Sequence, residues 1–295
     1  MTPTKNARLR QMLAQDRPVV APGAYDGITA RAVEHAGFGA VYMTGAGTAA
    51  SHGYPDFGLL TMSEMVANVA RIARSVSIPL VADADTGFGN ELNVTRTIRE
   101  YEAAGASGLH IEDQVSPKKC GHLDDKEVVP LDEFVAKIRA AVAARTDPDF
   151  VIIARTDARA VTGLDDAVDR ANAALAAGAD MAFVEALRTR EELTEVPRRV
   201  NGPCLLNIVL AGKTPDIDIA TAREMGYALT ILPSLLFGTA MDMFQRTLAD
   251  LRQTGKPPSS AGAIPVSERF RRFGSDEWDE LRTRFRAPEA DVANG

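Results

Sequence analysis

The sequence predicts an α/β protein built as a single closed (β/α)8 barrel of the TIM type, followed by a C-terminal helical extension. Short apolar segments alternate with longer ones whose apolar residues recur every three or four positions, as in alternating strands and helices. At four places a helical segment ends in glycine and leads directly into a strand, as at Gly178 before Met181 to Val184. Because glycine tolerates the left-handed conformation that ends many helices, this repeat indicates recurring units of one helix and one strand.

Eight strands are expected, with helices between them. The strands are residues 18–22, 40–43, 79–83, 108–111, 150–154, 181–184, 204–208 and 227–231. The most regular helical patterns are residues 62–76, 92–104, 131–144, 164–177 and 217–225. Eight such units within about 240 residues favour a closed barrel. A doubly wound open sheet is the alternative, but no glycine-rich phosphate-binding sequence follows the first strand.

Three regions are expected along the chain. Residues 1–252 form the catalytic barrel, and residues 253–263, rich in Gly, Pro and Ser, form a linker. Residues 264–295 form a charged, amphipathic helical tail that contains Trp278. Since an apolar stripe must be covered, we expect this tail to make a contact between subunits.

Composition excludes several classes of protein. The 295 residues are 45% hydrophobic and 25% charged, as in an ordinary globular protein. A formal charge of −7 without basic clusters argues against nucleic acid or a membrane surface as partner. Two cysteines are too few for a disulfide framework, and neither a secretion signal nor a run of ~18 apolar residues is present. We therefore expect a soluble, cytoplasmic protein.

Polar and ionisable residues recur at or just after the carboxyl ends of the expected strands. In barrel enzymes this rim holds the active site, so the pattern predicts an enzyme. The residues are Tyr42, Thr44, Asp83, Asp85, Glu112, Arg155, Asp157, Glu185 and Asn207.

Three of these residues suggest a metal site. Asp83 and Asp85 are two residues apart and share a strand face, and Glu112 ends the next strand. An Asp-x-Asp pair alone is more often solvated than metal-bound, but three converging carboxylates without cationic partners would repel one another. A divalent ion that prefers oxygen ligands, Mg²⁺ before Mn²⁺, would relieve that repulsion. Zinc is disfavoured because no histidine cluster accompanies the carboxylates.

The segment Lys118-Lys119-Cys120-Gly121-His122 is expected to form a lid over the site. Most lone cysteines are inert, but here lysines and His122 flank the thiol and should lower its pKa from about 8.5. This pattern leaves open whether Cys120 is a general acid or a nucleophile. Arg155 lies in an apolar strand and needs an anion, either a carboxylate such as Glu185 or the substrate. Cys204 is interpreted as a packing residue.

Together these segments resemble the isocitrate lyase and phosphoenolpyruvate mutase superfamily. The resemblance runs in the same order from about Pro18 to Leu251, and the lid sequence is specific to the carbon–carbon lyase branch. It is carried by residues 42–47, 83–89, 108–114, 118–122, 154–158, Asn207 and 212–215.

The resemblance implies a role for each matching residue. Mg²⁺ is bound directly by Asp85 and through water by Asp83 and Glu112, with Asp56 nearby. The 2-hydroxycarboxylate group is held by Tyr42, Thr44, Gly45, Ala46 and Arg155, and the second carboxylate by Gly121, His122, Glu185 and Asn207. Cys120 protonates the departing carbanion while the lid closes. The tail helix is exchanged between neighbours in a homotetramer.

The implied reaction is Mg²⁺-dependent cleavage of the C2–C3 bond of a small 2-hydroxy di- or tricarboxylate, of the 2-methylisocitrate or alkylmalate type. It yields pyruvate or glyoxylate and a saturated carboxylate such as succinate or propionate. Arg155, Lys118 and His122 stabilise the developing charge. Tyr42 is the expected base, and Glu112, acting through water, is its competitor. Alternatives are an oxaloacetate decarboxylase or hydrolase, a carboxyphosphonoenolpyruvate phosphonomutase, and a non-catalytic barrel that binds carboxylates.

Three positions depart from the family pattern. Ala46 and Thr44 stand where relatives often have glycine and serine, which predicts a tighter carboxylate-binding turn. Leu210 stands where the lyases usually have glutamate. An apolar residue there favours an alkylated malate over 2-methylisocitrate.

Overall fold

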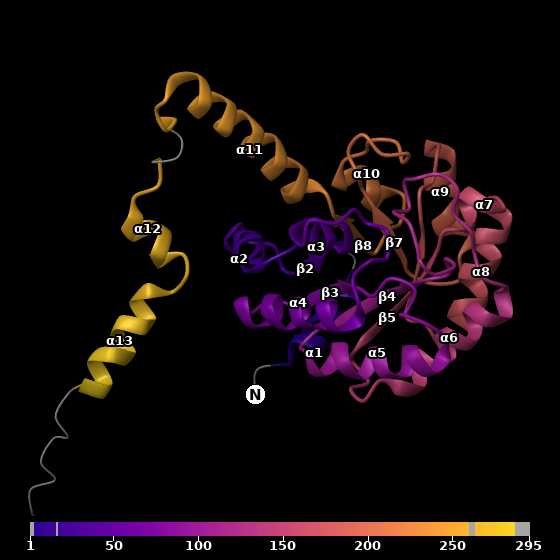
Figure 1. The fold of residues 1–295 in the computed structure, drawn as a ribbon. Coiled ribbons are helices and arrows are strands. Elements are labelled where there is room, and N and C mark those ends of the chain that lie inside the picture. Colours follow the sequence, from indigo (N-terminus) through magenta and orange to yellow (C-terminus); the bar gives the residue numbers. More distant parts are fainter. Residues whose placement is uncertain (1–2, 16, 260–262, 287–295) are drawn as a thin grey trace, which may run out of the picture. The chain divides into compact units, whose positions relative to one another are not determined.

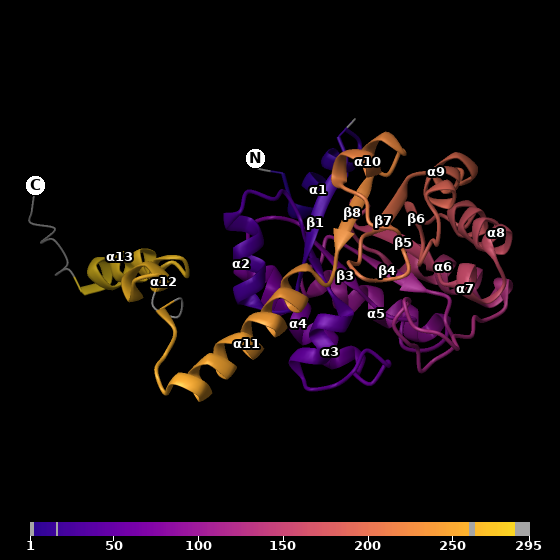
Figure 2. The same cartoon turned by 90° about the horizontal axis from the view of Figure 1, so that it is seen from above.

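Eight parallel strands close into a barrel in the order β1 to β8, which confirms the predicted fold (Figures 1 and 2). The computed structural model describes residues 3–15, 17–259 and 263–286. The strands are β1 (Val19–Ala24), β2 (Val41–Met43), β3 (Leu80–Asp83), β4 (Gly108–Glu112), β5 (Val151–Thr156), β6 (Met181–Val184), β7 (Cys204–Asn207) and β8 (Leu229–Leu232). Each expected strand therefore corresponds to an observed one.

Helices connect the strands. They are α1 (Lys5–Leu13), α2 (Gly27–His35), α3 (Gly45–Ser51), α4 (Met62–Ser75), α5 (Glu91–Ala103), α6 (Leu131–Ala144), α7 (Ala158–Val161), α8 (Leu164–Ala176), α9 (Arg190–Arg199), α10 (Ile219–Glu224), α11 (Leu235–Thr254), α12 (Val266–Arg271) and α13 (Ser275–Arg286). Side-chain caps fix several starts. Thr61 and Glu64 form a capping box at α4, and the Asn90 cap starts α5 one residue before the expected Leu92.

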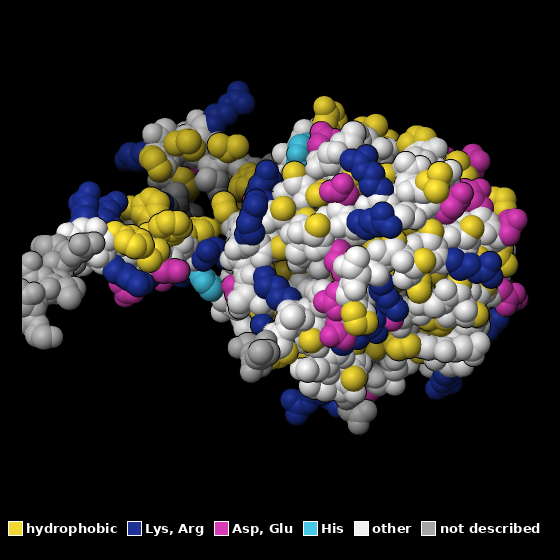
Figure 3. All heavy atoms as spheres, turned by 90° about the horizontal axis from the view of Figure 1, so that it is seen from below, with side chains coloured by type: hydrophobic (Ala, Val, Ile, Leu, Met, Phe, Trp, Pro, Cys, Tyr) yellow, Lys and Arg dark blue, Asp and Glu magenta, His cyan; other side chains and the backbone are white. Residues whose placement is uncertain are grey.

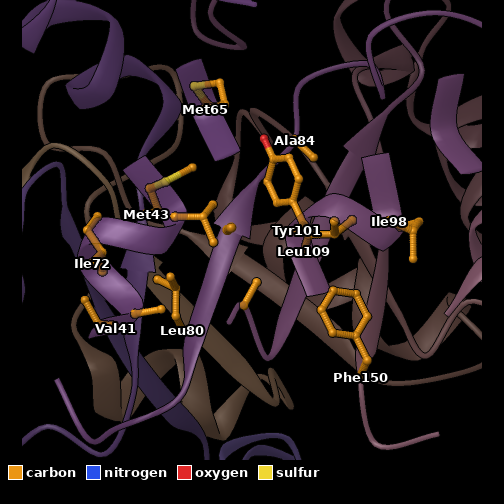
Figure 4. Packing of buried hydrophobic residues seen from close by; sticks show 14 of the residues in the cluster. Val41, Met43, Met65, Ile72, Leu80, Ala84, Ile98, Tyr101, Leu109 and Phe150 are labelled. Carbon is orange, nitrogen blue, oxygen red and sulfur yellow. The ribbon is translucent and has the colours of Figure 1, made fainter. Parts of the chain in front are cut away.

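Strand alternation separates two sets of buried side chains. Val41 and Met43 pack outward against the helices, in the apolar cluster shown in Figure 4, whereas Tyr42 between them packs inside the barrel. The inner cluster also contains Leu9 of α1, which is fully buried. Because successive residues of a strand face opposite sides, the same alternation turns the polar residues at the strand ends inward. Cys204 packs in an outer apolar cluster, as predicted.

The chain divides into two compact units, Met1–Thr239 and Ala240–Gly295. Helix α11 continues without interruption through residue 252, where the barrel was expected to end. The expected tail contains two helices, α12 and α13, separated at Gly274, whose φ is +80°. Residues 260–262 of the expected linker and 287–295 of the tail lie outside the described part. Among the described residues, no helix is both long and apolar enough to cross a membrane.

Candidate active site

The strand ends surround a cavity of about 190 Å³ in the first unit. Such a volume suits a small carboxylate rather than a large cofactor. Most of the expected substrate-binding residues line it. The lining consists of Tyr42, Thr44, Ala46, Asp56, Asp83, Cys120, Gly121, His122, Arg155, Phe183, Glu185, Asn207, Val209, Pro233, Ser234 and Phe237.

The carboxylates expected to bind metal have cationic partners, whereas the sequence analysis assumed that they have none. The Nζ atom of Lys118 lies 2.9 Å from Oδ1 of Asp85 and also forms an ion pair with Asp56. Nη1 of Arg155 lies 3.2 Å from Oε2 of Glu112. Within the described residues, no three Asp, Glu, His or Cys side chains are grouped closely enough to hold a metal ion. The lid lysine therefore contributes the positive charge at this end of the cavity.

Asp85 and Glu112 nevertheless keep unsatisfied oxygen atoms. Oδ1 of Asp85 and both carboxylate oxygens of Glu112 are buried and receive no hydrogen bond of regular geometry, although Lys118 and Arg155 lie within ion-pair distance of them. Burial raises the pKa of Asp85 to about 6, and the neighbouring charges of Asp83 and Asp56 add to the effect of burial. Burial also raises the pKa of Glu112 well above its usual range. Buried carboxylate oxygens with incomplete hydrogen bonding are costly, so these oxygens have capacity for a further ligand or cation.

Tyr42 and His110 form a buried pair beside Asp83. The Tyr42 hydroxyl lies 2.8 Å from Nε2 of His110 and 3.4 Å from Oδ2 of Asp83. Burial, followed by the charge of Asp83, raises the pKa of Tyr42 well above its usual value. Burial lowers the pKa of His110 to about 4. Tyr42 therefore keeps its proton at neutral pH and acts as a hydrogen-bond donor.

Arg155 is surrounded by carboxylates, as its position in an apolar strand predicted. Its Nε donates to Oδ2 of Asp157 at 2.9 Å, and Nη2 lies 3.5 Å from Oε2 of Glu185. The guanidinium group stacks on Phe183, 5.1 Å from the ring centroid. Asn207 donates from Nδ2 to Oε2 of Glu185 at 3.0 Å. Arg155 is thus held in a fixed orientation at the cavity.

The lid places Cys120, Gly121 and His122 in the cavity wall. The Cys120 backbone N–H donates to the Asp56 carbonyl oxygen at 3.0 Å. Nε2 of His122 lies 3.2 Å from Oε1 of Glu185. A Cβ atom on Gly121 would lie 2.5 Å from Nη2 of Arg155, so the turn approaches the arginine closely enough to require glycine.

The expected lowering of the Cys120 pKa is wrong. Burial raises its pKa, and the charges of Asp56 and Glu185 act in the same direction. The charge of Lys118 only partly opposes them, because that ammonium group is paired with Asp56 and Asp85. A thiol that stays protonated at neutral pH suits a proton donor better than a nucleophile.

The turn at Thr44 and the side chain of Leu210 differ from their expected arrangement. Thr44 caps helix α3, where its Oγ1 accepts from the Gly47 N–H at 3.2 Å, so the expected turn is the first turn of a helix. A Cβ atom on Gly45 would lie 2.4 Å from Oδ2 of Asp83. Leu210 is 62% exposed and does not line the cavity, whereas its neighbour Val209 does. Both residues follow the end of strand β7 at Asn207, and Leu210 begins a turn.

Sequence reasoning missed the apolar part of the wall. Phe183 lies on an inward-facing position of β6, and Pro233, Ser234 and Phe237 follow the carboxyl end of β8. The position of Pro233, Ser234 and Phe237 just after strand β8 is the signal that could have identified them.

A closed parallel barrel with a cavity at its strand ends, lined by ionisable residues, is the arrangement of a TIM-barrel enzyme. The family model described as phosphoenolpyruvate phosphomutase matches residues 9–252. The chain is 49% identical to 2,3-dimethylmalate lyase of Eubacterium barkeri over 229 residues, 77% of this chain and 79% of the relative. It is 45% identical to 2-methylisocitrate lyase of Aeropyrum pernix over 247 residues, 84% of this chain and 80% of the relative.

Solved structures of related enzymes are also similar to this chain. A 2,3-dimethylmalate lyase structure matches with a TM-score of 0.92 at 41% identity and covers 100% of both chains. Phosphonopyruvate hydrolase in complex with oxalate and Mg²⁺ matches with a TM-score of 0.87 at 35% identity, over 96% of this chain and 99% of that one. The chain belongs to the phosphoenolpyruvate mutase/isocitrate lyase superfamily, within its carbon–carbon lyases.

Proposed function

We propose that this protein is a Mg²⁺-dependent lyase that breaks the C2–C3 bond of a 2-hydroxy di- or tricarboxylate. The products are a 2-oxoacid, pyruvate or glyoxylate, and a saturated carboxylate such as succinate or propionate. The observation that carries the proposal is the position of the Cys120 thiol, whose pKa burial raises, in the same cavity wall as Arg155 and His122. A proton donor beside groups that bind carboxylates is what protonation of a carboxylate-stabilised carbanion requires.

We propose that the carboxylates at the acidic end of the site bind Mg²⁺, with Mn²⁺ as a chemically similar substitute. The buried carboxylate oxygens of Asp85 and Glu112 are the ligand type that these ions prefer, and Asp83 and Asp56 lie in the adjoining cavity wall. The related phosphonopyruvate hydrolase structure contains Mg²⁺ together with oxalate. When bound, Mg²⁺ would lower the pKa of the substrate hydroxyl group.

Among the two candidate bases, the pKa shifts favour Glu112. Burial raises the pKa of both Tyr42 and Glu112. A raised pKa makes a carboxylate a stronger base, whereas for tyrosine it moves the pKa further above neutral pH. Tyr42 then orients the substrate by donating a hydrogen bond, and Glu112 accepts the hydroxyl proton.

Bond cleavage follows from the loss of that proton. The electron pair of the O–H bond forms the C2 carbonyl, and the pair from the C2–C3 bond moves onto C3 and its carboxylate. Arg155 and His122 stabilise the negative charge on that carboxylate. The positive charge of Lys118, at the acidic end of the cavity, acts in the same direction. Cys120 gives its proton to C3, and the resulting thiolate regains a proton from solvent.

The apolar wall supports an alkyl substituent on the substrate. Val209, Phe183 and Phe237 line the cavity with the polar groups. Burying a methyl group against such side chains is favourable, whereas a third carboxylate would lose hydration there. We therefore favour an alkylmalate as substrate, on the basis of Val209 rather than of Leu210.

We also propose a homotetramer in which the C-terminal helices pack on a neighbouring subunit. Apolar side chains gather on these helices (Figure 3) and include Phe244, Leu248, Phe270, Trp278 and Phe285, which are exposed in the single chain. Exposed aromatic residues in such number indicate an interaction surface. Light scattering of the full chain and of Trp278→Asp tests this: the variant should dissociate, and a monomeric parent chain would refute the proposal.

A coupled assay of 2-oxoacid release tests the lyase function. The substrates are 2,3-dimethylmalate, longer alkylmalates, 2-methylisocitrate and isocitrate, with and without EDTA, and with oxaloacetate as a decarboxylation control. We expect Mg²⁺-dependent release of a 2-oxoacid from at least one alkylmalate. Turnover of oxaloacetate alone would refute the lyase assignment.

A further inference from the structure

A buried lysine outside the expected site residues connects the lid to the barrel. The two chain segments at the ends of the lid lie side by side. Gln114 and Val128 form an antiparallel bridge, and the Val115 N–H donates to the Glu127 carbonyl oxygen at 2.9 Å. Lys126 directly precedes the second of these two paired segments, and its side chain is 1% exposed. A lysine buried this deeply must satisfy its charge inside the protein.

The two observed partners of Lys126 lie on different parts of the fold. Its Nζ donates to the carbonyl oxygen of Gly121, in the lid turn, and to Oδ1 of Asp157 at 2.8 Å, after strand β5. The other oxygen of Asp157 accepts from Nε of Arg155 at 2.9 Å. One ammonium group therefore ties the turn that carries Cys120 to the carboxylate that orients Arg155.

Hydrogen bonds to Asp113 hold the backbone at Asp157 in place. Its backbone N–H donates to Oδ1 of Asp113 at 2.8 Å, and Oδ2 of Asp113 accepts from the Thr156 hydroxyl at 2.6 Å. Arg170 donates to the same Asp113 oxygen at 3.2 Å and to the Val129 carbonyl at 2.8 Å. The barrel end of the Lys126 contact is thus rigid, so the lid end is the part that can move.

We propose that Lys126 is a positioning residue that holds the Cys120–His122 turn closed over the cavity. The proposal rests on the proposed lyase function for its catalytic consequence but not for its structural one. When the turn lifts away, Lys126 loses the Gly121 carbonyl and keeps only Asp157. Charge-assisted hydrogen bonds of this kind are among the stronger ones, so opening costs free energy in the parent protein. A variant without the ammonium group lacks this cost and should open more readily.

Access to the Cys120 thiol measures the lid directly. We compare Lys126→Met with Lys126→Arg, which keeps the charge, and with Lys137→Met as a matched control. Lys137 is also buried but lies on α6, 3.6 Å from Glu133. Iodoacetamide alkylation is followed from pH 6 to 10.5 by peptide mass spectrometry, which separates Cys120 from the buried Cys204. Thermal melting checks that each variant is folded.

We expect Lys126→Met to raise the plateau rate of Cys120 alkylation about tenfold without moving the pH midpoint. Lys126→Arg should restore most of the protection, and Lys137→Met should match the parent protein. An unchanged alkylation rate in folded Lys126→Met would overturn the proposal. A change confined to the midpoint would also overturn it, because it would show an effect on thiol ionisation and not on access.

Turnover gives a second readout. In the lyase assay, Lys126→Met should lower kcat at least tenfold and leave the affinity for Mg²⁺ unchanged, since Lys126 contacts none of the acidic residues around the proposed metal. Equal turnover by Lys126→Met and the parent would refute the positioning role. If the parent itself releases no 2-oxoacid, the proposed function fails, and the alkylation result decides the role of Lys126 separately.

Discussion

The ammonium nitrogen of Lys118 lies 2.9 Å from Oδ1 of Asp85 and also pairs with Asp56. The lid lysine is therefore directed at the acidic end of the cavity and not at the thiol two residues along. Its charge therefore only partly offsets burial, which raises the pKa of Cys120. This position also places the lysine and the proposed Mg²⁺ in competition for the same carboxylates.

Removing this lysine should strengthen metal binding. In Lys118→Met, the carboxylates of Asp85 and Asp56 lose their cationic partner, so Mg²⁺ should bind about tenfold more tightly in calorimetry without substrate. Lys119→Met is the control, because Nζ of Lys119 contacts only the Asp125 carbonyl, at 3.3 Å, among described residues. Equal or weaker Mg²⁺ binding by Lys118→Met would contradict the competition.

Replacing the thiol should stop the chemistry but not the binding. Cys120→Ser keeps the size of the side chain but holds its proton more strongly, so we expect kcat to fall about 10²- to 10⁴-fold with little change in KM. Cys204→Ala, in an apolar cluster away from the cavity, should retain most activity. Steady-state kinetics measure both variants. Near-parental turnover by Cys120→Ser would instead favour a decarboxylase or a phosphonomutase.

The pH dependence of the thiol has a definite sign. Burial, together with the charges of Asp56 and Glu185, disfavours the thiolate, so the midpoint of Cys120 alkylation in Mg²⁺-free protein should lie above that of free cysteine. Below that midpoint, the rate should rise about tenfold per pH unit. Asp56→Asn removes one of these charges and should lower the midpoint. A midpoint near pH 7 in the parent protein would contradict this assignment.

The structure and the sequence pattern assign substrate specificity to different, adjacent residues. Val209 lines the cavity, whereas Leu210 is 62% exposed. Val209→Ala should lower kcat/KM for alkylmalates about tenfold relative to malate, since it removes apolar contact with the alkyl group. Leu210→Ala should leave that ratio within about twofold. The reverse result would restore Leu210 as the specificity residue.

The barrel could be predicted because its signals are local. Glycine-ended helices and apolar strands identified all eight strands, and the expected helix at 131–144 coincides with α6. Strand alternation also indicated which polar residues face the cavity, such as Asp83 and Asn207. Each of these inferences depends on neighbours in sequence, which a periodic pattern records directly.

The electrostatics could not be predicted in this way. The partners of Lys118 are Asp56 and Asp85, 62 and 33 residues away, and only the folded lid brings them together. Sequence proximity suggested that the lysines act on Cys120, whereas distance in space assigns Lys118 to the carboxylates. The contact of Lys126 with Asp157, 31 residues away, was missed for the same reason. Its contact with Gly121 depends on how the lid folds.

Deuterium incorporation tests the central claim most directly. The reaction is run in D2O with Mg²⁺ and 2,3-dimethylmalate or another accepted alkylmalate, and the products are analysed by mass spectrometry. Proton delivery by an exchangeable thiol predicts equal amounts of 2-oxoacid and saturated carboxylate, the latter with a single deuterium at the former C3. A saturated carboxylate without deuterium, or release of CO2 in place of a 2-oxoacid, would contradict cleavage with protonation by Cys120.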